Sequence, residues 1–531
     1  MSRWQVFTDV DIVDGTGKPA FRGEVGVHND RIEYVGPVRE MHPTKADVTS
    51  LHGAVVAPGF IDVHSHADNA AFLDEDDTSK ILQGVTTEIL GNCGMTLAPR
   101  SPAHGSALEA YAGRLFPAVS WTGHRFADYW SEAERRGLVT NAAPLVGHGT
   151  IRIAVKGMED SLATQGELQE MQAYLEEALE AGAFGFSSGL IYPPGMFSDT
   201  DELIALAHSL NGAHYVTHMR DEGQTLEESV AEAIAIGREA KVPVQISHHK
   251  AAGKAHWGKT AKTLPMMDAA RSEGLDIRCD VYPYTASSTM LTTCLPDWTQ
   301  AGGDATTLAL LRDPVMRMKI RADLESEPGG WAEDVAWQRG DGIRIGSTPD
   351  HRFEGKTVSE IAKTQGIEPV EALFMVLEEE RLKVSVILYS MEEGDVKRVL
   401  AYPWTMVGSD GLPPGLGGLP HPRLYGTFPR VIARYVRDLG LLSLEQAIHK
   451  MTGLAADTFG LKDRGVVREG AIADLVSFDA ETIRDVATFD DPIRTPSGIH
   501  WVMQSGHMVV RGGQYVGHRQ GRRLRRQERS S

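Results

Sequence analysis

The sequence has little of several features, and each scarcity excludes a class of protein. Its 531 residues include only three cysteines, an odd number that argues against a disulfide framework and for a reducing compartment. No apolar run reaches the roughly 18 residues of a membrane span, and the N-terminus lacks the basic-then-apolar pattern of a signal sequence. We therefore expect a soluble protein, cytoplasmic by default, without a membrane partner.

Positive charge is also scarce. There are 53 lysines and arginines against 72 aspartates and glutamates, a net charge of −19 that disfavours nucleic acid as a partner. The only concentrated basic stretch is the tail at residues 517–531, which is expected to be solvated and disordered. A small molecule is thus the expected partner, and nothing in the composition indicates an oligomeric state.

The feature that stands out is an apolar segment that ends in two histidines. Residues 54–63 are almost entirely apolar, as in a buried parallel strand, and His64 and His66 follow directly. Side chains two residues apart in a strand point to the same face, so both imidazoles can reach one metal ion. Such a pair is weak evidence alone, but it gains weight from other candidate ligands at the ends of later strands.

The middle of the chain alternates short apolar runs with helical stretches, which is typical of βα units. Repeated units of this kind predict an α/β fold with a (β/α)₈, TIM-like barrel, whose catalytic groups come from the C-terminal ends of the strands. The eight candidate strands lie near residues 54–63, 84–92, 142–147, 183–188, 213–218, 242–248, 275–282 and 403–409.

The two ends of the chain are rich in short strands and tight turns. We expect residues 1–53 and 465–516 to form one small β-sandwich domain, with the barrel spanning residues 54–464. The connection between the seventh and eighth strands is too long for a plain barrel loop. It predicts an inserted subdomain, at about residues 290–400, that covers the mouth of the barrel.

Four further polar residues stand where predicted strands end: Cys93, His218, His248 and Asp410. Zinc takes nitrogen and sulfur ligands, so the thiol and the imidazoles are candidate zinc ligands. His214 and His249 neighbour these positions but are expected to lie deeper or on the opposite face. An acid at the end of a buried strand has little structural use unless it is paired or catalytic, so Asp410 could move a proton during hydrolysis.

Together these motifs resemble the D-aminoacylase (N-acyl-D-amino-acid deacylase) family of the amidohydrolase superfamily. The similarity runs from about residue 5 to 515, and it rests on residues 58–66, 91–94, 217–220, 247–250, 282–289, 409–411 and 421–428.

The resemblance implies a ligand set and a set of roles. Cys93, His218 and His248 would hold one tight Zn²⁺. A second, weaker site would be framed by His64, His66 and Asp410, and share the Cys93 sulfur. Asp410 and His66 would be the catalytic residues. The substrate would be held by Lys250, Arg423, Tyr192 and Tyr282. Tyr282 and Tyr284 are expected to face the same way, so the sequence does not choose between them.

The implied activity is zinc-dependent hydrolysis of the N-acyl amide bond of N-acyl-D-amino acids, giving a carboxylate and a free D-amino acid. The alternatives within the enzyme class are an N-acyl-D-aspartate or N-acyl-D-glutamate deacylase, a D-dipeptidase and a cyclic-amide hydrolase. The alternative from a different class is a non-catalytic barrel scaffold, which the complete set of candidate ligands disfavours.

The stretch after Tyr284 bears on the substrate side chain. In the acidic-substrate branch of the family an arginine in this stretch faces the second carboxylate, whereas residues 285–296 contain none. A buried carboxylate without a cation is strongly disfavoured. With Met290, Leu291 and Leu295 available to line the pocket, we expect neutral or apolar side chains, unless Arg220 or the insertion supplies the missing charge.

Overall fold

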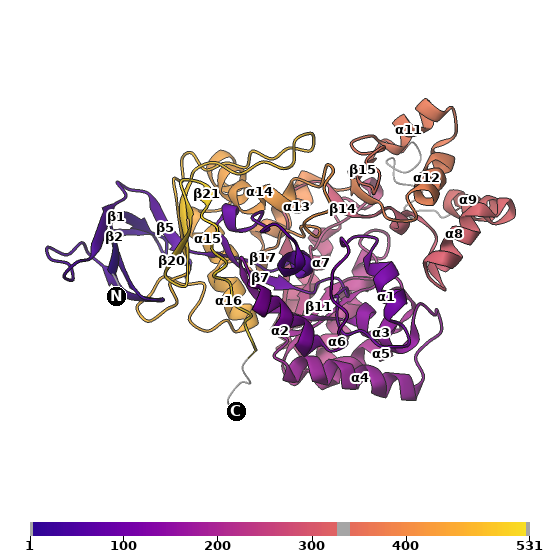
Figure 1. Cartoon of the computed structure of the whole chain (residues 1–531), viewed down its shortest axis with the longest axis horizontal. Helices are drawn as coiled ribbons and strands as arrows, with labels where there is room; N and C mark the ends of the chain where they lie inside the picture. Colours follow the sequence, from indigo (N-terminus) through magenta and orange to yellow (C-terminus); the bar gives the residue numbers. More distant parts are fainter. Residues whose placement is uncertain (1–3, 327–339, 527–531) are drawn as a thin grey trace.

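The middle of the chain forms a parallel barrel in the computed structural model, which describes residues 4–326 and 340–526 (Figure 1). One sheet has the strand order β17-β13-β12-β11-β10-β9 and another the order β6-β7-β8; because β8 and β9 are consecutive in the chain, the two form one wall. A parallel bridge between Ser65 and Gly411 joins the first strand to the last. The predicted α/β barrel is therefore confirmed. Its strands are β6 (Phe60–Asp62), β7 (Val85–Leu90), β8 (Asn141–Pro144), β9 (Val146–Gly147), β10 (Gly185–Gly189), β11 (His214–His218), β12 (Val244–Ile246), β13 (Ile277–Val281) and β17 (Thr405–Val407).

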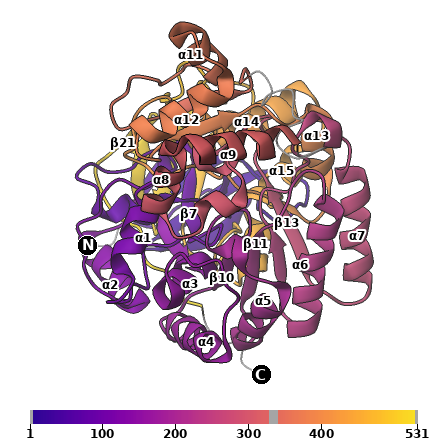
Figure 2. The ribbon, with the colours of Figure 1, turned by 90° about the vertical axis from the view of Figure 1, so that its right-hand side faces the viewer.

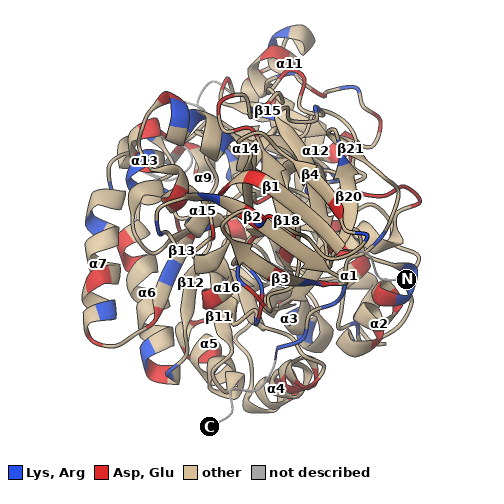
Figure 3. Cartoon of the chain, turned by 90° about the vertical axis from the view of Figure 1, so that its left-hand side faces the viewer, with Lys and Arg blue, Asp and Glu red and all other residues tan. Residues whose placement is uncertain are grey.

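Helices surround this wall, and local sequence signals set where several of them begin. The helix α4 starts after Thr164, whose side chain accepts a hydrogen bond from the Glu167 backbone while Glu167 reaches back, a capping box. Acidic and basic residues are interspersed along outer helices such as α6 and α7 (Figure 3). Within the described residues, no helix is both long and apolar enough to cross a membrane. The helices are α1 (Gly105–Ala112), α2 (Phe126–Arg136), α3 (His148–Lys156), α4 (Gln165–Glu180), α5 (Thr200–Ala207), α6 (Leu226–Ala240), α7 (Thr260–Ser272), α13 (Glu393–Ala401), α14 (Arg423–Arg430), α15 (Leu444–Met451) and α16 (Gly453–Phe459).

Both ends of the chain contribute to one nine-stranded sheet, with the order β21-β20-β19-β18-β5-β1-β2-β3 and β4 paired to β1. The expected single strand at 54–63 is in fact two strands, because β5 pairs with β1 and β18 in this sheet and only β6 belongs to the barrel. Gly59 lies at the switch, where a Cβ would come within 2.4 Å of the Thr86 side chain. The sheet contains β1 (Trp4–Ile12), β2 (Phe21–His28), β3 (Arg31–Gly36), β4 (Asp47–Ser50), β5 (Val55–Pro58), β18 (Leu475–Phe478), β19 (Ile499–Gln504), β20 (His507–Arg511) and β21 (Gln514–Tyr515).

The long connection after β13 forms a unit with its own three-stranded sheet, in the order β14-β16-β15, and its own apolar core. It leaves the barrel at the C-terminal end of β13. Figure 2 shows α8, α9 and α12 in front of the barrel strands when the molecule is viewed from that end. The elements are β14 (Ser287–Met290), α8 (Asp304–Arg312), α9 (Pro314–Ser326), β15 (Ile343–Ser347), α11 (Val358–Gln365), α12 (Pro369–Glu379) and β16 (Ser385–Leu388).

The basic tail differs from the expectation of disorder. As far as Arg526 it runs along the start of β8: Gly521 donates to the carbonyl of Leu138 (2.8 Å), and Leu524 donates to that of Ala142 (2.7 Å). The Arg523 side chain donates to the carbonyl of Ala181, at the C-terminal end of α4, where unpaired carbonyls attract a cation. The prediction of disorder is therefore wrong for residues 517–526, and residues 527–531 lie outside the described part.

Candidate metal centre

The predicted metal ligands meet at the C-terminal mouth of the barrel. His64 and His66 follow β6, Cys93 follows β7, His218 ends β11, His248 follows β12 and Asp410 follows β17. All six side chains are buried, with at most 7% of any residue exposed. Short strands with polar residues just past their ends thus converge on one point, because parallel strands of a barrel end on the same face.

The sulfur of Cys93 lies at the centre of this group. Its Sγ is 3.3 Å from His64 Nε2, 3.8 Å from His218 Nδ1 and 3.6 Å from His248 Nε2. Ligand atoms bound to one tetrahedral zinc at 2.0–2.3 Å are roughly 3.5 Å apart, so the spacing found here is that of a zinc site. The donor atoms of His64, Cys93, His248 and Asp410 all lie within 4.8 Å of one another. The donor set fits zinc.

Three of these residues have a backbone conformation that is unfavourable for side chains with a Cβ. Cys93, His248 and Asp410 have φ values of 54°, 35° and 48°, in the left-handed region. Such a conformation costs on the order of 1 kcal/mol per residue and is concentrated at functional sites. Gly91 and Gly94, with φ of 78° and 72°, allow the sharp turn that directs the Cys93 thiol into the barrel.

Charge within the site favours binding of a cation. Burial raises the pKa of the Cys93 thiol, but the His64 charge and the hydrogen bonds from the three imidazoles bring that pKa well below its ordinary value. Burial likewise raises the pKa of the Asp410 carboxyl, and the charges of Arg423, His64 and His248 more than reverse this. A thiolate and a carboxylate, the forms that bind metal, therefore face each other across the site.

His66 joins the group through Asp410. Its Nε2 is 3.1 Å from Asp410 Oδ1, and His64 Nε2 is 3.4 Å from the same oxygen. Burial lowers the pKa of His66, but the hydrogen bond to Asp410 and the nearby Cys93 raise it to about 9. The two imidazoles therefore lie beside one oxygen of the carboxylate, while its other oxygen pairs with Arg423.

The predicted substrate-binding cations also lie beside the donors. Arg423, at the start of α14, places Nη1 at 2.9 Å from Asp410 Oδ2, and its Nη2 donates to the carbonyl of Ser288 (2.9 Å). The Lys250 ammonium forms a short ion pair with Glu222 and lies 2.8 Å from His248 Nδ1. Both cations are almost fully buried at the edge of the mouth.

The two candidate tyrosines occupy different places. The Tyr282 ring lies beside both cations, with its centroid 4.5 Å from Arg423 Cζ and 5.8 Å from Lys250 Nζ. Tyr284 packs on His421, with ring centroids 5.1 Å apart, and has Arg430 Cζ at 4.6 Å from its centroid. Because β13 already ends at Val281, the alternation of a strand does not extend to these residues. Both rings lie edge-on to His421, and Tyr282 is the one that also has Arg423 and Lys250 beside it.

Tyr192 lies at the site, whereas His214 and His249, the two histidines that neighbour candidate ligands in the sequence, do not. Tyr192 lies edge-on to His218, with centroids 5.0 Å apart, and its hydroxyl is 2.8 Å from Thr289 Oγ1 in the insertion. His214 packs against the ring of Phe459, and His249 Nε2 lies 2.8 Å from Thr263 Oγ1 on α7. Tyr192 is therefore part of the site, whereas the side chains of His214 and His249 make their contacts with Phe459 and Thr263.

Two buried acids at the site were not predicted from the sequence. Asp280, in β13, has Oδ1 at 3.4 Å from His64 Nδ1 and accepts a hydrogen bond from the His248 backbone (2.9 Å). Glu222, four residues after His218, reaches both His218 and His248. No local pattern singled out Asp280, because β13 also contains Arg278 and the predicted strand at 275–282 contains a second acid, Asp276. Glu222 lies where the sequence indicates the beginning of a helix.

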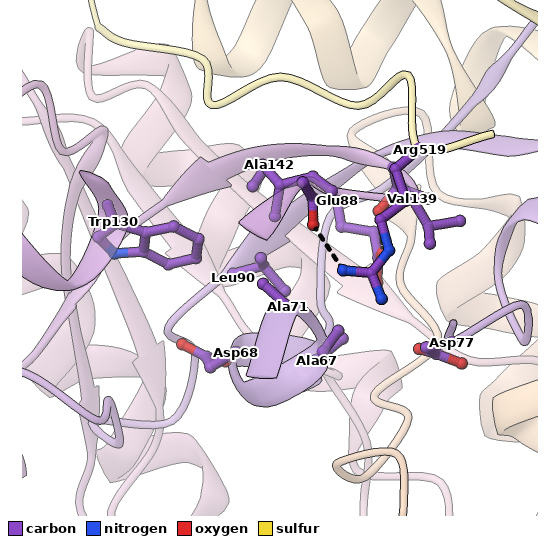
Figure 4. A pocket seen from close by; sticks show the side chains of 14 residues that line it. Ala67, Asp68, Ala71, Asp77, Glu88, Leu90, Trp130, Val139, Ala142 and Arg519 are labelled. Carbon is purple, nitrogen blue, oxygen red and sulfur yellow. Dashed lines mark hydrogen bonds between the residues drawn. The ribbon is translucent and has the colours of Figure 1, made fainter. Parts of the chain in front are cut away.

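A buried ion network connects the ends of the first and last barrel strands. Lys80 lies 3.2 Å from carboxylate oxygens of both Asp62 and Glu88, and Asp62 accepts hydrogen bonds from the backbones of His64 (3.1 Å) and Ser409 (2.8 Å). A cavity of about 20 Å³ lies beside this network, lined by Asp68, Glu88, Trp130 and Arg519 among others (Figure 4). That volume holds one water molecule and no substrate.

Comparison with known proteins adds to this geometry. The model of the amidohydrolase family matches residues 47–516. A D-aminoacylase of Alcaligenes xylosoxydans xylosoxydans is 39% identical over 97% of this chain and 96% of its own length; an N-acyl-D-glutamate deacylase of the same organism is 37% identical over 97% and 95%. The solved structure of N-acyl-D-glutamate deacylase from Bordetella bronchiseptica, complexed with zinc and a phosphonate inhibitor, superimposes with a TM-score of 0.82 at 34% identity, over 98% of this chain and 99% of that one.

Proposed function

Because this chain belongs to the amidohydrolase family, we propose that it hydrolyses the N-acyl amide bond of N-acyl-D-amino acids with the help of zinc, releasing a carboxylate and the free D-amino acid. The observation that carries this proposal is the convergence of Cys93, its three imidazole neighbours and Asp410 in one buried group, with two cations beside them. D-aminoacylase and the deacylase for N-acyl-D-glutamate match this chain over nearly its full length.

Zinc would be held by residues that suit it. Cys93, His218 and His248 would hold the tight ion, because a thiolate with imidazoles is a preferred zinc donor set. His64, His66 and Asp410 would frame a second, weaker position that shares the Cys93 sulfur. When bound, zinc supplies Lewis acidity that polarises the scissile carbonyl and makes an attacking water more acidic.

Asp410 is the proposed general base and acid. Its ionised carboxylate can accept a proton as water attacks the carbonyl carbon, and it can deliver that proton to the leaving nitrogen as the carbon–nitrogen bond breaks. His66, 3.1 Å from Oδ1, orients the carboxylate, and Arg423, 2.9 Å from Oδ2, keeps it ionised. Of the site residues, Asp410 is thus the one that moves a proton.

The α-carboxylate of the substrate would bind beside Tyr282, between Arg423 and Lys250. In the described part of the chain, Arg423 Nε has no hydrogen-bond partner although it is buried. A guanidinium with donors left over can bind a carboxylate in a charge-assisted pair. Tyr192, on the other side of the mouth, would orient the amide through its hydroxyl.

We also propose an architecture for the parts around the barrel. The terminal segments, residues 1–53 and 465–516, would act as one β unit, since their strands share the nine-stranded sheet. The insertion would cover the site, because β14 contacts Arg423 through Ser288 and Tyr192 through Thr289.

A screen of N-acetyl-D- and N-acetyl-L-amino acids tests the activity. We expect release of the free amino acid from the D series only, loss of turnover after treatment with a strong chelator, and recovery on addition of zinc. Equal rates for both series would contradict the proposed substrate class, whereas activity that survives removal of all metal would contradict the proposed chemistry.

The structure bears on the side chain of the substrate as well. Arg220, a candidate for the missing charge, pairs with Glu232 (2.9 Å). A cation overlooked in the sequence, Arg114, reaches Thr292 Oγ1 (3.3 Å), but it is fully buried and pairs with Asp304 (2.7 Å). Every guanidinium nitrogen of both arginines therefore already donates a hydrogen bond within the protein, unlike Nε of Arg423.

The apolar residues expected to line the pocket lie in different places. Met290 belongs to an apolar cluster that includes Met95 and Leu412 and has Tyr192 packed against it. Leu291 and Leu295 instead lie in the core of the insertion, so the expectation that they are available to the pocket is wrong for these two. The wall near Tyr192 is nonetheless apolar, and this supports a neutral or apolar substrate side chain.

We therefore expect N-acetyl-D-methionine or N-acetyl-D-leucine to be hydrolysed with a kcat/KM at least about tenfold above that for N-acetyl-D-glutamate, since burying a second carboxylate without a free cation costs several kcal/mol. Steady-state kinetics on the three substrates measures this ratio. A preference for the glutamate would overturn the interpretation and direct attention to Arg114 or Arg220.

A further inference from the structure

Glu222 lies on the outer side of two metal-ligand histidines. Its Oε1 is 3.0 Å from His248 Nδ1, and its Oε2 is 3.7 Å from His218 Nε2. These are the ring nitrogens that point away from Cys93, because Cys93 faces Nε2 of His248 and Nδ1 of His218. One carboxylate thus lies within hydrogen-bonding distance of the outer nitrogen of His248, and it faces the outer nitrogen of His218 from beyond that distance.

The chemistry of imidazole explains why an acceptor is needed there. A neutral ring that binds a metal through one nitrogen carries its proton on the other, so that outer nitrogen can only donate. In His248 the outer nitrogen has two neighbours, Lys250 Nζ and Glu222, and of these only the carboxylate can accept. A carboxylate in this position holds the ring at its angle and makes the inner nitrogen a better ligand.

Glu222 is better suited to this role than to binding a metal of its own. Its oxygens and the outer nitrogens of His218 and His248 form a group that could in principle hold an ion. The Lys250 ammonium, however, lies against the same Oε1 and within 2.8 Å of His248 Nδ1, so a positive charge already occupies that place. The ion pair with the lysine also holds the carboxylate next to the rings.

We propose that Glu222 is a shared positioning residue, which fixes the proton and the orientation of His248 by a hydrogen bond, favours those of His218 by its charge, and thereby sets the affinity of the tight metal site. The proposal rests on the proposed function for the identity of the metal. It concerns residues that do not touch the substrate, so it can be tested without any substrate.

The main test is Glu222→Gln, which keeps the size of the side chain but replaces one oxygen by a donor and removes the charge. We expect its zinc affinity, measured by competition with a coloured chelator, to fall roughly 10- to 100-fold, the usual effect of losing the outer partner of a metal-bound histidine. Cobalt substitution should show a shifted thiolate-to-cobalt absorption band, because the angles of both rings relative to Cys93 change.

The matched control is Glu232→Gln. Glu232 also accepts from a cation, the partly exposed Arg220, and its hydrogen bonds run to Arg220 and Thr200 and not to either histidine. For this variant we expect the zinc affinity to remain within twofold of that of the parent. The position of the cobalt band should equal that of the parent within error. Glu222→Asp, which retains the charge with a shorter reach, should recover part of the affinity.

An affinity of Glu222→Gln within twofold of the parent, or an equal loss in Glu232→Gln, would overturn the proposal. Should Glu222→Gln fold poorly, Glu222→Asp carries the same test. For that variant, a zinc affinity like that of the parent together with a shifted cobalt band would contradict the proposal. Because zinc affinity is measured without substrate, failure of this proposal and failure of the proposed deacylase activity give different results.

Discussion

Replacing Cys93 with alanine is expected to abolish both tight zinc binding and turnover. The Sγ lies 3.3–3.8 Å from nitrogens of His64, His218 and His248, so every metal position that these rings frame depends on it. Alanine leaves the imidazoles without the one soft, anionic donor at the centre of the group. We expect the zinc content of the purified variant to fall from about one per chain to near zero, and hydrolysis to fall to background.

The matched control for this change is Cys294→Ala. Cys294 is equally buried, in the core of the insertion, where burial raises the pKa of its thiol to about 12. Its loss removes a buried sulfur but no ligand, so zinc content and kcat should remain close to those of the parent. Full zinc and turnover in Cys93→Ala would show that another donor set holds the metal.

Replacing Asp410 with asparagine is expected to lower kcat by roughly 10²–10⁴, the range for a lost general base, while the tight zinc remains. Asparagine retains the hydrogen-bonding shape toward His66 and Arg423 but cannot take up a proton. Because Cys93, His218 and His248 are untouched, elemental analysis should still find about one zinc per chain. The loss should therefore appear in kcat and not in metal content.

Asp395→Asn provides the comparison for that variant. Asp395 is also buried and paired with an arginine, Arg398, but it lies on α13 and contacts Thr260 instead of the metal ligands. A similar fall in kcat in both variants would indicate that general destabilisation causes it. A kcat near the parent value in Asp410→Asn would mean that another group moves the proton.

Much of the site could be predicted from the sequence because strand ends in a parallel barrel all face one way. Once His64, Cys93, His218, His248 and Asp410 were each placed just past an apolar strand, their convergence followed from the fold class alone. The order of the residues along the chain did not matter to this argument, and the distances from Cys93 Sγ agree with it.

What the sequence could not provide were relations between side chains that no local pattern encodes. The position of Tyr282 beside two cations depends on where β13 ends, and the approach of Glu222 to two rings depends on the path of the loop after β11. Pairing of Arg114 with Asp304 joins segments 190 residues apart in the chain. Such contacts are set by packing of distant elements, so local periodicity carries no sign of them.

The sequence by itself determined the kind of protein: a barrel whose apolar strands end in zinc-type ligands, with β-rich ends and a long insertion. Tertiary structure alone decided how these parts meet. It divided the segment at 54–63 between two sheets at Gly59, and it ordered the basic tail as far as Arg526 against the start of β8. The physical reason is the same in both cases. Periodicity determines which residues of a segment become buried, whereas its hydrogen-bonding partners depend on which backbone edges the rest of the chain leaves unpaired.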